Sequence, residues 1–567
     1  MRKTAAGALA LFLSLSLTAQ TPTPPLTPLV RTVEVNVTNV DVIVTDGKGQ
    51  RVTDLTRDDF VLEEDGAPQT ITNFYAASEG KAVVEQAADA KDVKDAPARS
   101  EPPVPAAPKA RIAIFVDNMH LTPLNRRQVL RAVGDFVAGS LGPNVEAAVS
   151  TWDHRLLPRG PFTNDGKALK DVLAKLEEEP AKGEQSLSER DQVFRSIDQA
   201  LRTPTNDRTR DVMLRSAIGN VRSYALHLVS EVDDTLAALG VAVDQLSGVE
   251  GRKVLLYVSE RLPQIPGSEM FQYLRESLGF GSPFRREVPT DMEFDRKDRF
   301  EDVVRKAHAA GVALYPFEAR GLALDSSLSA SRPASEVRLD PAREEMNNLT
   351  MLQYLARETG GSAIFSRNTF KEALEDVGRD FTTFYSLGYQ SLRPVVGKDR
   401  RVKVSVRRPG LTVRSRSGHV EKSPEARVGD AVVSRLWFPK VQNPLNARLD
   451  TGQSKKKGKG YVLPLRFLVP YDKLTLVPEG DRMRGRLVFQ VAALDDTGRL
   501  SPLRIQVGPI DMPRSALPDT AGKEFVFDTE VELRPVGQVV SFALTDEPSR
   551  LTSFVQLPLR VTAKEAK

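Results

Sequence analysis

The chain has 567 residues, of which 40% are hydrophobic and 27% charged, so it has the composition of a globular protein and is too long for one hydrophobic core. Its 79 basic and 75 acidic side chains give a formal charge of +4. This near balance argues against nucleic acid as a partner, because binding to phosphates needs clustered surplus positive charge. There is no cysteine, which excludes disulfides, thiolate nucleophiles and zinc–cysteine sites.

The first twenty residues have the pattern of a secretory signal. Arg2 and Lys3 precede an apolar run over residues 5–17, and small residues follow near Ala19. We therefore predict a signal peptide at 1–20 and a secreted, periplasmic or cell-envelope protein; a retained membrane anchor is the alternative. No second apolar stretch approaches the length of a membrane span, so no further transmembrane helix is expected.

Residues 30–78 alternate valines with polar residues and contain two Asp-Gly turns, which predicts a small β unit. Residues 79–109 are rich in Ala, Pro, Lys, Glu and Asp, which is typical of a disordered linker. From residue 426 to 567 short strands and turns follow one another and no helix is expected, which predicts a β-sandwich domain.

Between these parts, residues 110–420 read as an α/β domain. An apolar run ends abruptly in Asp117, and Thr122 and Pro123 then have the character of a helix start. Further apolar strands, expected at 145–152, 253–258, 312–317 and 362–365, alternate with helices, including a long helical insertion at 184–247. This alternation predicts a doubly wound, mostly parallel sheet.

Five stretches of the chain resemble von Willebrand factor A (VWA)-related proteins of the acidobacterial type. They read VDVIVTDGKGQRVTDLTRDDFVLEEDGAPQTITNFY, IFVDNMHLTPLNR, EGRKVLLYVSERLP, FYSLGYQS and RRVKVSVRRPGLTVRSRSGHV, and they lie within about residues 30–420. The resemblance implies a VWA-type, Rossmann-like sheet. It also implies a metal-ion-dependent adhesion site, whose first strand in the family ends in DxSxS and which binds protein ligands.

The family's metal-site pattern is degenerate in this sequence. Asp117 is kept, but Met119 and Leu121 stand where the resemblance implies hydroxyl ligands, and neither offers oxygen to a hard cation. For the family's separate threonine, Thr163 and Thr235 are candidates. Asp117 and Glu260, with Asp153 as a third carboxylate, remain the candidate ligands for Mg²⁺ or Ca²⁺ through water.

The positions of polar residues after the predicted strands also indicate a site, independently of the resemblance. If the strands that end in these acids are neighbours, six polar side chains should converge at the carboxyl edge of the sheet: Asp117, His120, Asp153, His154, Ser259 and Glu260. A transition-metal site built on His120 and His154 is one interpretation. The plainer interpretation is that Asp117 accepts backbone N–H groups from its own loop and helix.

No nucleophile elbow surrounds Ser259, and no phosphate-binding glycine loop or zinc helix is found, so we predict that the chain is not an enzyme; a hydrolase using Ser259 is the alternative. Two long loops are expected at the ligand edge, over 261–296 and 321–341. The hypothesis is an exported, noncatalytic binding or adhesion-type protein with a degenerate metal-ion-dependent adhesion site; a divalent-metal-dependent VWA adhesion module is the alternative. Its ligand, a protein or a surface polymer, would meet Asp117 and Glu260 and the loop aromatics Phe271, Tyr273, Phe280 and Phe284; alternatively those rings only hold the loop in place.

Overall fold

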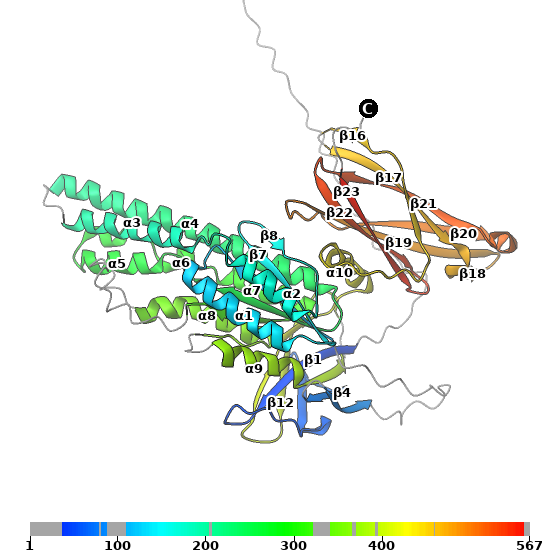
Figure 1. The fold of residues 1–567 in the computed structure, drawn as a ribbon, viewed down its shortest axis with the longest axis horizontal. Helices are drawn as coiled ribbons and strands as arrows, with labels where there is room; N and C mark the ends of the chain where they lie inside the picture. Colours follow the sequence, from blue (N-terminus) through cyan, green and yellow to red (C-terminus); the bar gives the residue numbers. More distant parts are fainter. Residues whose placement is uncertain are drawn as a thin grey trace, which may run out of the picture.

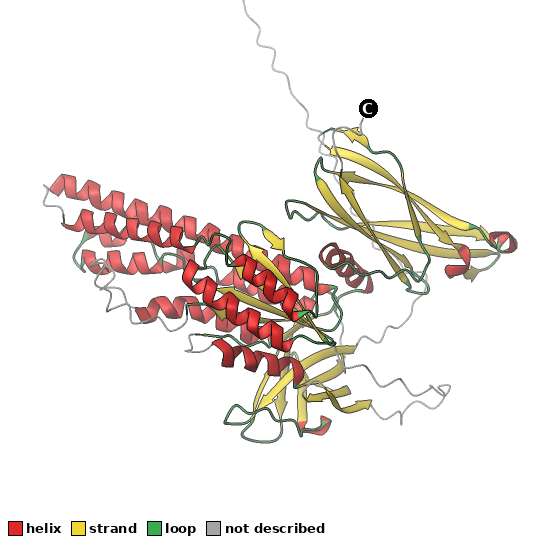
Figure 2. Cartoon of the chain, viewed as in Figure 1, coloured by secondary structure: helices red, strands yellow, loops and turns green. Residues whose placement is uncertain are grey.

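The computed structural model describes residues 37–78, 81–87, 109–202, 207–320, 341–365, 370–391, 395–458 and 460–560. The expected signal peptide at 1–20 lies outside these residues, as does most of the second long loop. Figures 1 and 2 show three parts: a β unit that contains the first strands, a helix-rich α/β part, and a second β part near the C-terminus. None of the helices in the described ranges is both long and apolar enough to cross a membrane.

The α/β part is organised around a five-stranded sheet with the order β10-β9-β6-β7-β8. All neighbours are parallel except β8, which returns antiparallel to β7. The predicted α/β class with a mostly parallel sheet is therefore confirmed. The predicted strand at 362–365 is reduced to a single parallel bridge between Phe317 and Ile364. The strands are β6 (Ala110–Asp117), β7 (Val145–Trp152), β8 (Leu156–Pro158), β9 (Arg252–Ser259) and β10 (Val312–Glu318).

Helices cover both faces of this sheet because successive side chains of each strand point to opposite sides. Ile112, Ile114 and Val116 of β6 pack against α1, α2 and α9, whereas Ala113 and Phe115 pack against α4, α7 and α8. The result is a three-layer, doubly wound arrangement. The helices are α1 (Pro123–Ser140), α2 (Gly166–Leu176), α4 (Asp207–Ser247), α7 (Lys297–Ala310), α8 (Pro341–Thr359) and α9 (Phe370–Thr382).

A helical extension projects beyond the sheet. The predicted long helix is α4, with 41 residues, and α3 (Gly183–Arg202) lies beside it (Figure 1). The stretch 261–296, expected as a long loop, instead folds into α5 (Ser268–Leu278), η2 (Pro283–Arg286) and α6 (Asp291–Phe294). In α5, Met270, Phe271, Tyr273 and Leu274 lie at helical spacing and complete a hydrophobic core with α3 and α4.

The N-terminal β unit is completed by strands that follow the α/β part in the sequence. One sheet has the order β13-β1-β11-β4-β5 and the other β14-β12-β2-β3, and their side chains share one core. The sequence analysis placed residues 384–420 in the α/β domain, but their strands pair here; Val42, for example, lies opposite Tyr385. Residues 81–87, expected within the disordered linker 79–109, form strand β5 on the edge of β4, and 88–108 lie outside the described residues. The strands are β1 (Val37–Thr45), β2 (Phe60–Glu64), β3 (Ala67–Gln69), β4 (Ile71–Ser78), β5 (Lys81–Ala87), β11 (Phe384–Gln390), β12 (Asp399–Val406), β13 (Thr412–Ser415) and β14 (Gly418–Val420).

A buried ionic junction joins this β unit to the α/β part. Asp380 of α9 is 1% exposed and accepts bonds from the guanidinium groups of Arg51 and Arg414 and, at 3.0 Å, from the hydroxyl of Tyr315 on β10. Two segments of the β unit, at Arg51 and at Arg414, therefore meet β10 and α9 of the α/β part at one carboxylate. Removing one partner of such a buried pair is costly because the other charge is left without compensation.

The C-terminal part contains two antiparallel sheets whose inner side chains share one hydrophobic core. The strands expected between 461 and 561 are present. A helix that was not expected, α10 (Pro424–Trp437), precedes them and packs Val432 and Trp437 against the second sheet. The strands are β15 (Arg448–Thr451), β16 (Lys455–Lys457), β17 (Gly460–Pro470) and β21 (Glu524–Leu533) in one sheet, and β18 (Val477–Glu479), β19 (Arg482–Asp495), β20 (Arg504–Pro513), β22 (Gly537–Asp546) and β23 (Thr552–Arg560) in the other.

Candidate functional site

Asp117 ends the central strand β6 and is completely buried. One carboxylate oxygen, Oδ1, accepts the backbone N–H of Met119 at 3.1 Å. The other oxygen, Oδ2, accepts bonds from His120 Nδ1 at 2.7 Å, the Tyr257 hydroxyl at 2.8 Å and the Ser259 hydroxyl at 3.0 Å. We call these five residues the Asp117 network: Asp117, Met119, His120, Tyr257 and Ser259.

The charge of Asp117 determines the proton affinity of its neighbours. Burial disfavours the imidazolium of His120, but the charge and the hydrogen bond of Asp117 outweigh that effect, so the pKa of His120 is raised above its ordinary value. Burial, reinforced by the same carboxylate, raises the pKa of Tyr257 well above its usual range. The network is therefore a buried carboxylate that accepts bonds from two hydroxyls and from an imidazole whose protonated form it favours.

Glu260, the residue after β9, contacts the start of helix α1 and is not part of the Asp117 network. Its Oε1 accepts the backbone N–H of Thr122 at 2.5 Å and the hydroxyl of Thr122 at 2.7 Å. Thr122 is the N-cap of α1, so the carboxylate lies at the positive end of that helix, where a negative charge is stabilising. Glu260 is 4% exposed, and its contact with Thr122 fixes the loop that follows Asp117 against β9.

A further carboxylate at this edge, Glu318, was not found from the sequence. Glu318 ends β10 opposite Ser259, is 2% exposed and accepts bonds from the Nε atom and backbone N–H of Arg320. Burial raises the pKa of Glu318 although Arg320 opposes the shift. The strand was expected to end one residue earlier, at Phe317. Glu318 follows an apolar run just as Asp117 does, and the same pattern would have identified it.

Asp153 and His154 follow β7 and do not join the network. Asp153 forms an ion pair with Lys182, and His154 is exposed in a left-handed conformation with φ 52°. His120 in contrast is buried against Asp117. The strand order makes β7, β6 and β9 neighbours as predicted, and it brings Asp117, His120 and Ser259 together. The two histidines expected for a transition-metal site do not converge.

The donor set does not fit the divalent cation implied by the resemblance. Three hydrogen-bond donors converge on Asp117 Oδ2, and Glu260 Oε1 is used by Thr122, while Met119 supplies only its N–H. In the described ranges no three His, Asp or Glu side chains are grouped so as to hold a metal ion. Asn118 has a buried Oδ1 that lacks a bond, but one amide oxygen is far short of the six to eight ligands typical of Ca²⁺.

The two threonines considered as metal ligands are both used elsewhere. Thr235 is buried and accepts the indole N–H of Trp152 at 3.1 Å. Thr163 accepts the backbone N–H of Asp165 at the start of α2. Neither threonine is hydrogen-bonded to Asp117 or Glu260.

Ser259 does not have the geometry of an activated nucleophile. Its hydroxyl donates to Asp117 Oδ2, and His120 binds that same oxygen, so the carboxylate lies between the serine and the imidazole. A hydrolytic triad needs the imidazole between them to accept the serine proton. Ser259 is also only 1% exposed, which keeps a substrate carbonyl away from its hydroxyl.

The aromatic residues expected to contact a ligand are mostly internal. Phe271 is fully buried and Tyr273 is 1% exposed, both in the core of the helical extension, where the Tyr273 hydroxyl donates to Asp198. Phe284 is also buried. Phe280 is 94% exposed and Met292 90% exposed, and these two are the apolar side chains that this stretch offers to solvent. The expectation of an aromatic binding loop is therefore wrong for Phe271 and Tyr273.

No model of a known protein family matches the chain, and no curated protein matches it. Among solved structures, an aerotolerance-related membrane protein of Bacteroides fragilis is 12% identical and aligns over 48% of this chain and 98% of its own, with a TM-score of 0.22. Proximal thread matrix protein 1 of the mussel byssus, described with a zinc-occupied MIDAS motif, is 11% identical over 50% of this chain and 47% of its own, with a TM-score of 0.21. The manganese-loaded TRAP protein of Plasmodium vivax is 9% identical over 55% and 95%, with a TM-score of 0.19. Scores this low do not establish a common fold, so the description of the α/β part rests on its own sheet.

Proposed function

We propose that this chain is an exported, noncatalytic binding protein of the VWA type, whose α/β domain recognises a protein or a surface polymer without a bound metal ion. The observation that carries the proposal is the Asp117 network. In it the carboxylate at the centre of the ligand edge is fully hydrogen-bonded to protein donors. In this proposal the C-terminal sheets form a β-sandwich that presents the α/β domain.

The arrangement of Asp117, His120 and Ser259 supports a role other than hydrolysis. The Ser259 hydroxyl faces the buried Asp117 carboxylate and the backbone oxygen of Arg261, and it is not bonded to the imidazole of His120. The same arrangement supports metal independence, because a cation at Asp117 would have to displace His120 or the two hydroxyls. Such a displacement leaves buried donors without partners, at a cost of about 1–3 kcal/mol each.

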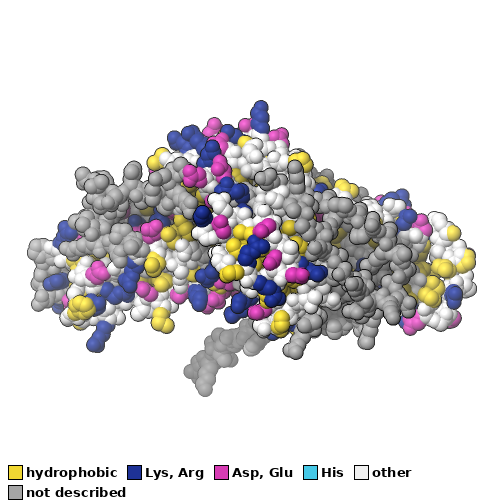
Figure 3. Space-filling view, turned by 90° about the horizontal axis from the view of Figure 1, so that it is seen from below, with side chains coloured by type: hydrophobic (Ala, Val, Ile, Leu, Met, Phe, Trp, Pro, Cys, Tyr) yellow, Lys and Arg dark blue, Asp and Glu magenta, His cyan; other side chains and the backbone are white. Residues whose placement is uncertain are grey.

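The helical extension is the surface we assign to the partner. Phe280 and Met292 are almost wholly exposed, although each follows a segment that packs into the core of the extension. Large exposed apolar side chains on a well-packed scaffold are typical of protein contacts. On the face drawn in Figure 3, basic and acidic side chains are interspersed, which favours a protein or polymer surface over a polyanion.

The proposal is tested by binding in the presence of chelator. The full chain, immobilised, captures its partner from a cell-envelope extract in EDTA, and millimolar Mg²⁺, Ca²⁺ or Mn²⁺ changes neither capture nor melting temperature. The double variant Phe280→Ser with Met292→Ser loses capture and keeps its melting temperature. Deleting 262–296 is not a clean test, because that deletion removes core residues such as Phe271.

The matched control is Val441→Ser, which changes an exposed apolar side chain far from the extension, after α10. Its capture remains that of the wild type. Capture that requires a divalent cation, or a rise in melting temperature that Asp117→Asn abolishes, contradicts metal independence. Cleavage of ester or peptide substrates that Ser259→Ala eliminates contradicts the noncatalytic assignment.

A further inference from the structure

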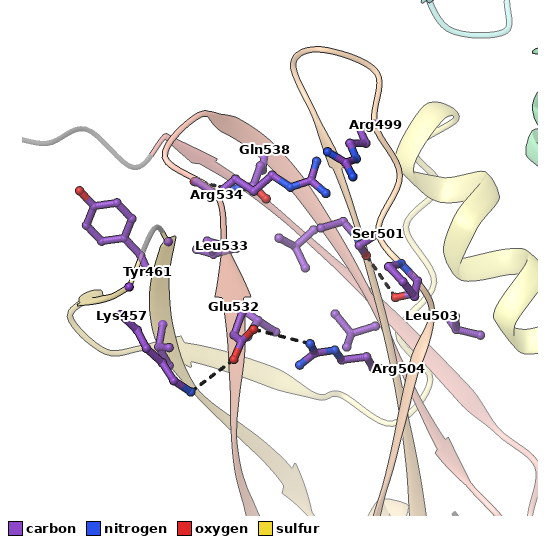
Figure 4. Close-up of a pocket in the computed structure, with 18 residues that line it drawn as sticks. Lys457, Tyr461, Arg499, Ser501, Leu503, Arg504, Glu532, Leu533, Arg534 and Gln538 are labelled. Carbon is purple, nitrogen blue, oxygen red and sulfur yellow. Dashed lines mark hydrogen bonds and ion pairs between the residues drawn. The ribbon is translucent and has the colours of Figure 1, made fainter. Parts of the chain in front are cut away.

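The two C-terminal sheets separate at one end and enclose a pocket of about 620 Å³. Its walls come from both sheets: β17 and β21 on one side, β19 and β22 on the other. The connection between β19 and β20 closes the top (Figure 4). Pockets of about 300–1,000 Å³ are the size that holds small organic ligands.

The floor of the pocket is apolar. Val462, Val491, Val531, Leu533 and Val540 line it, and each is at most 8% exposed. Four of them belong to the hydrophobic core shared by the two sheets, so the pocket is an opening at the end of that core. A ligand that enters it therefore gains by burying apolar surface.

The rim of the pocket is basic. Lys457, Arg499, Arg504 and Arg534 line it, against a single carboxylate, Glu532. Lys457 and Arg504 both face that carboxylate, with N–O distances of 3.3 Å and 3.7 Å. Glu532 thus compensates Lys457 and Arg504 on one side of the rim. An anion is favoured on the other side, near Arg499 and Arg534.

The other two cations are held in place by a buried aspartate. Asp495 Oδ2 accepts Arg534 Nη1 at 2.5 Å, and Asp495 Oδ1 accepts the backbone N–H groups of Thr497 at 3.1 Å and Arg499 at 2.9 Å. Its side chain is 4% exposed. Asp495 therefore fixes both the guanidinium of Arg534 and the backbone from which Arg499 projects.

The guanidinium groups of Arg499 and Arg534 point toward one another above the apolar floor (Figure 4). Within the described residues no carboxylate pairs with the Arg499 guanidinium. Because Asp495 compensates Arg534 alone, the two guanidinium groups together keep one unbalanced positive charge, which an anion between them offsets. Guanidinium groups present parallel N–H donors that match the two oxygens of a carboxylate.

We propose that this pocket binds a small organic carboxylate that carries an apolar chain. The carboxylate lies between Arg499 and Arg534, and the chain extends onto the valines of the floor. Asp495 acts as a positioning residue, since it holds the backbone of Arg499 and the guanidinium of Arg534 and does not itself contact the ligand. The site is separate from the Asp117 network and does not depend on the function proposed for that network.

The test is calorimetric titration of the full chain with hexanoate, acetate, hexyltrimethylammonium and inorganic phosphate. Hexanoate binds saturably with one site, and affinity falls about fourfold for each methylene removed toward acetate, as expected for burial of a CH₂ group. Hexyltrimethylammonium, which has the chain but the opposite charge, does not bind. Phosphate, which has the charge but no chain, binds more weakly than hexanoate.

Two variants locate the binding. Arg499→Gln lowers the hexanoate affinity about tenfold or more, the effect of removing a hydrogen bond to a charged group. Ala493→Leu, which fills the pocket from β19, abolishes binding while the melting temperature stays near that of the wild type. Arg514→Gln, an equal change of charge at the other end of the same sheet, leaves the affinity unchanged. Absence of saturable hexanoate binding, equal affinity for acetate or phosphate, or unchanged affinity in Arg499→Gln overturns the proposal.

Discussion

Replacing Asp117 by Asn should destabilise the α/β part strongly, and the size of the effect follows from the contacts. The substitution keeps the shape of the side chain, but it removes the charge that faces His120 and turns one acceptor into a donor. Breaking a buried ion pair by removing one partner costs about 3–5 kcal/mol. For a part that spans residues 110–382, that corresponds to a fall in melting temperature of about 5–10 °C.

The pH dependence of this loss distinguishes the network from a simple cavity. In the wild type the pKa of His120 is raised in the folded state. The ion pair therefore contributes fully below the unfolded pKa of 6.5, and its contribution is lost as the pH rises through the folded value. In Asp117→Asn the burial that opposes the imidazolium is no longer outweighed by Asp117, so the variant should lose stability when the pH falls below 6.5.

The assay is thermal unfolding of both proteins from about pH 5.5 to about pH 8.5, the range in which histidine titrates. The difference between their melting temperatures should be largest at the acidic end. Asp153→Asn is the control, because Asp153 also follows a strand of the sheet but forms a half-exposed pair with Lys182 worth at most about 1 kcal/mol. A difference for Asp117→Asn that does not change with pH, or that is as small as the control's, refutes the reasoning.

Three further predictions concern other parts of the molecule. Asp380→Asn should cost about 3 kcal/mol or more, because two arginines lose a buried anion, and should make the chain around residues 384–420 sensitive to limited proteolysis. Burial, with nearby positive charges, lowers the pKa of His419 to about 3, so stability should fall below pH 6.5 by up to about 1.4 kcal/mol per pH unit. His419→Gln should remove that slope in urea titrations, and the exposed control His227→Gln should not. Phe271→Ala should cost about 3–5 kcal/mol and Phe280→Ala less than about 0.5 kcal/mol by thermal unfolding, since only the former leaves a cavity.

Local patterns were sufficient to predict the sheet and its acidic end. The apolar run before Asp117, the helix start at Thr122 and the helical insertion at 184–247 depend on neighbours within a few residues, and all three are present in the structure. Helix α10 could have been found in the same way, because Ser423 and Pro424 form an N-cap and first turn. Because strands follow α10, the surrounding sequence pattern indicates a β domain and gives no further sign of a helix.

Pairings between distant segments were beyond the reach of the sequence. Strand β11 pairs with β1 across more than 300 residues, and nothing in FYSLGYQS distinguishes that partner from the adjacent parallel sheet. The loop at 261–296 was misread for a related reason. Its prolines and glycines indicate a loop, whereas Phe271 and Tyr273 become core residues only because α3 and α4 lie against them.

Tyr257 shows why the partners of Asp117 were harder to predict than Asp117 itself. Within the strand KVLLYVS it reads as one more apolar residue, and only the parallel register with β6 brings its hydroxyl to the carboxylate. Together with His120 it occupies the positions around Asp117 from which a cation would be bound. The Asp117 carboxylate raises the pKa of His120, so it favours a positive charge on that side chain. The stability of this edge should therefore change with pH and not with the concentration of a divalent metal.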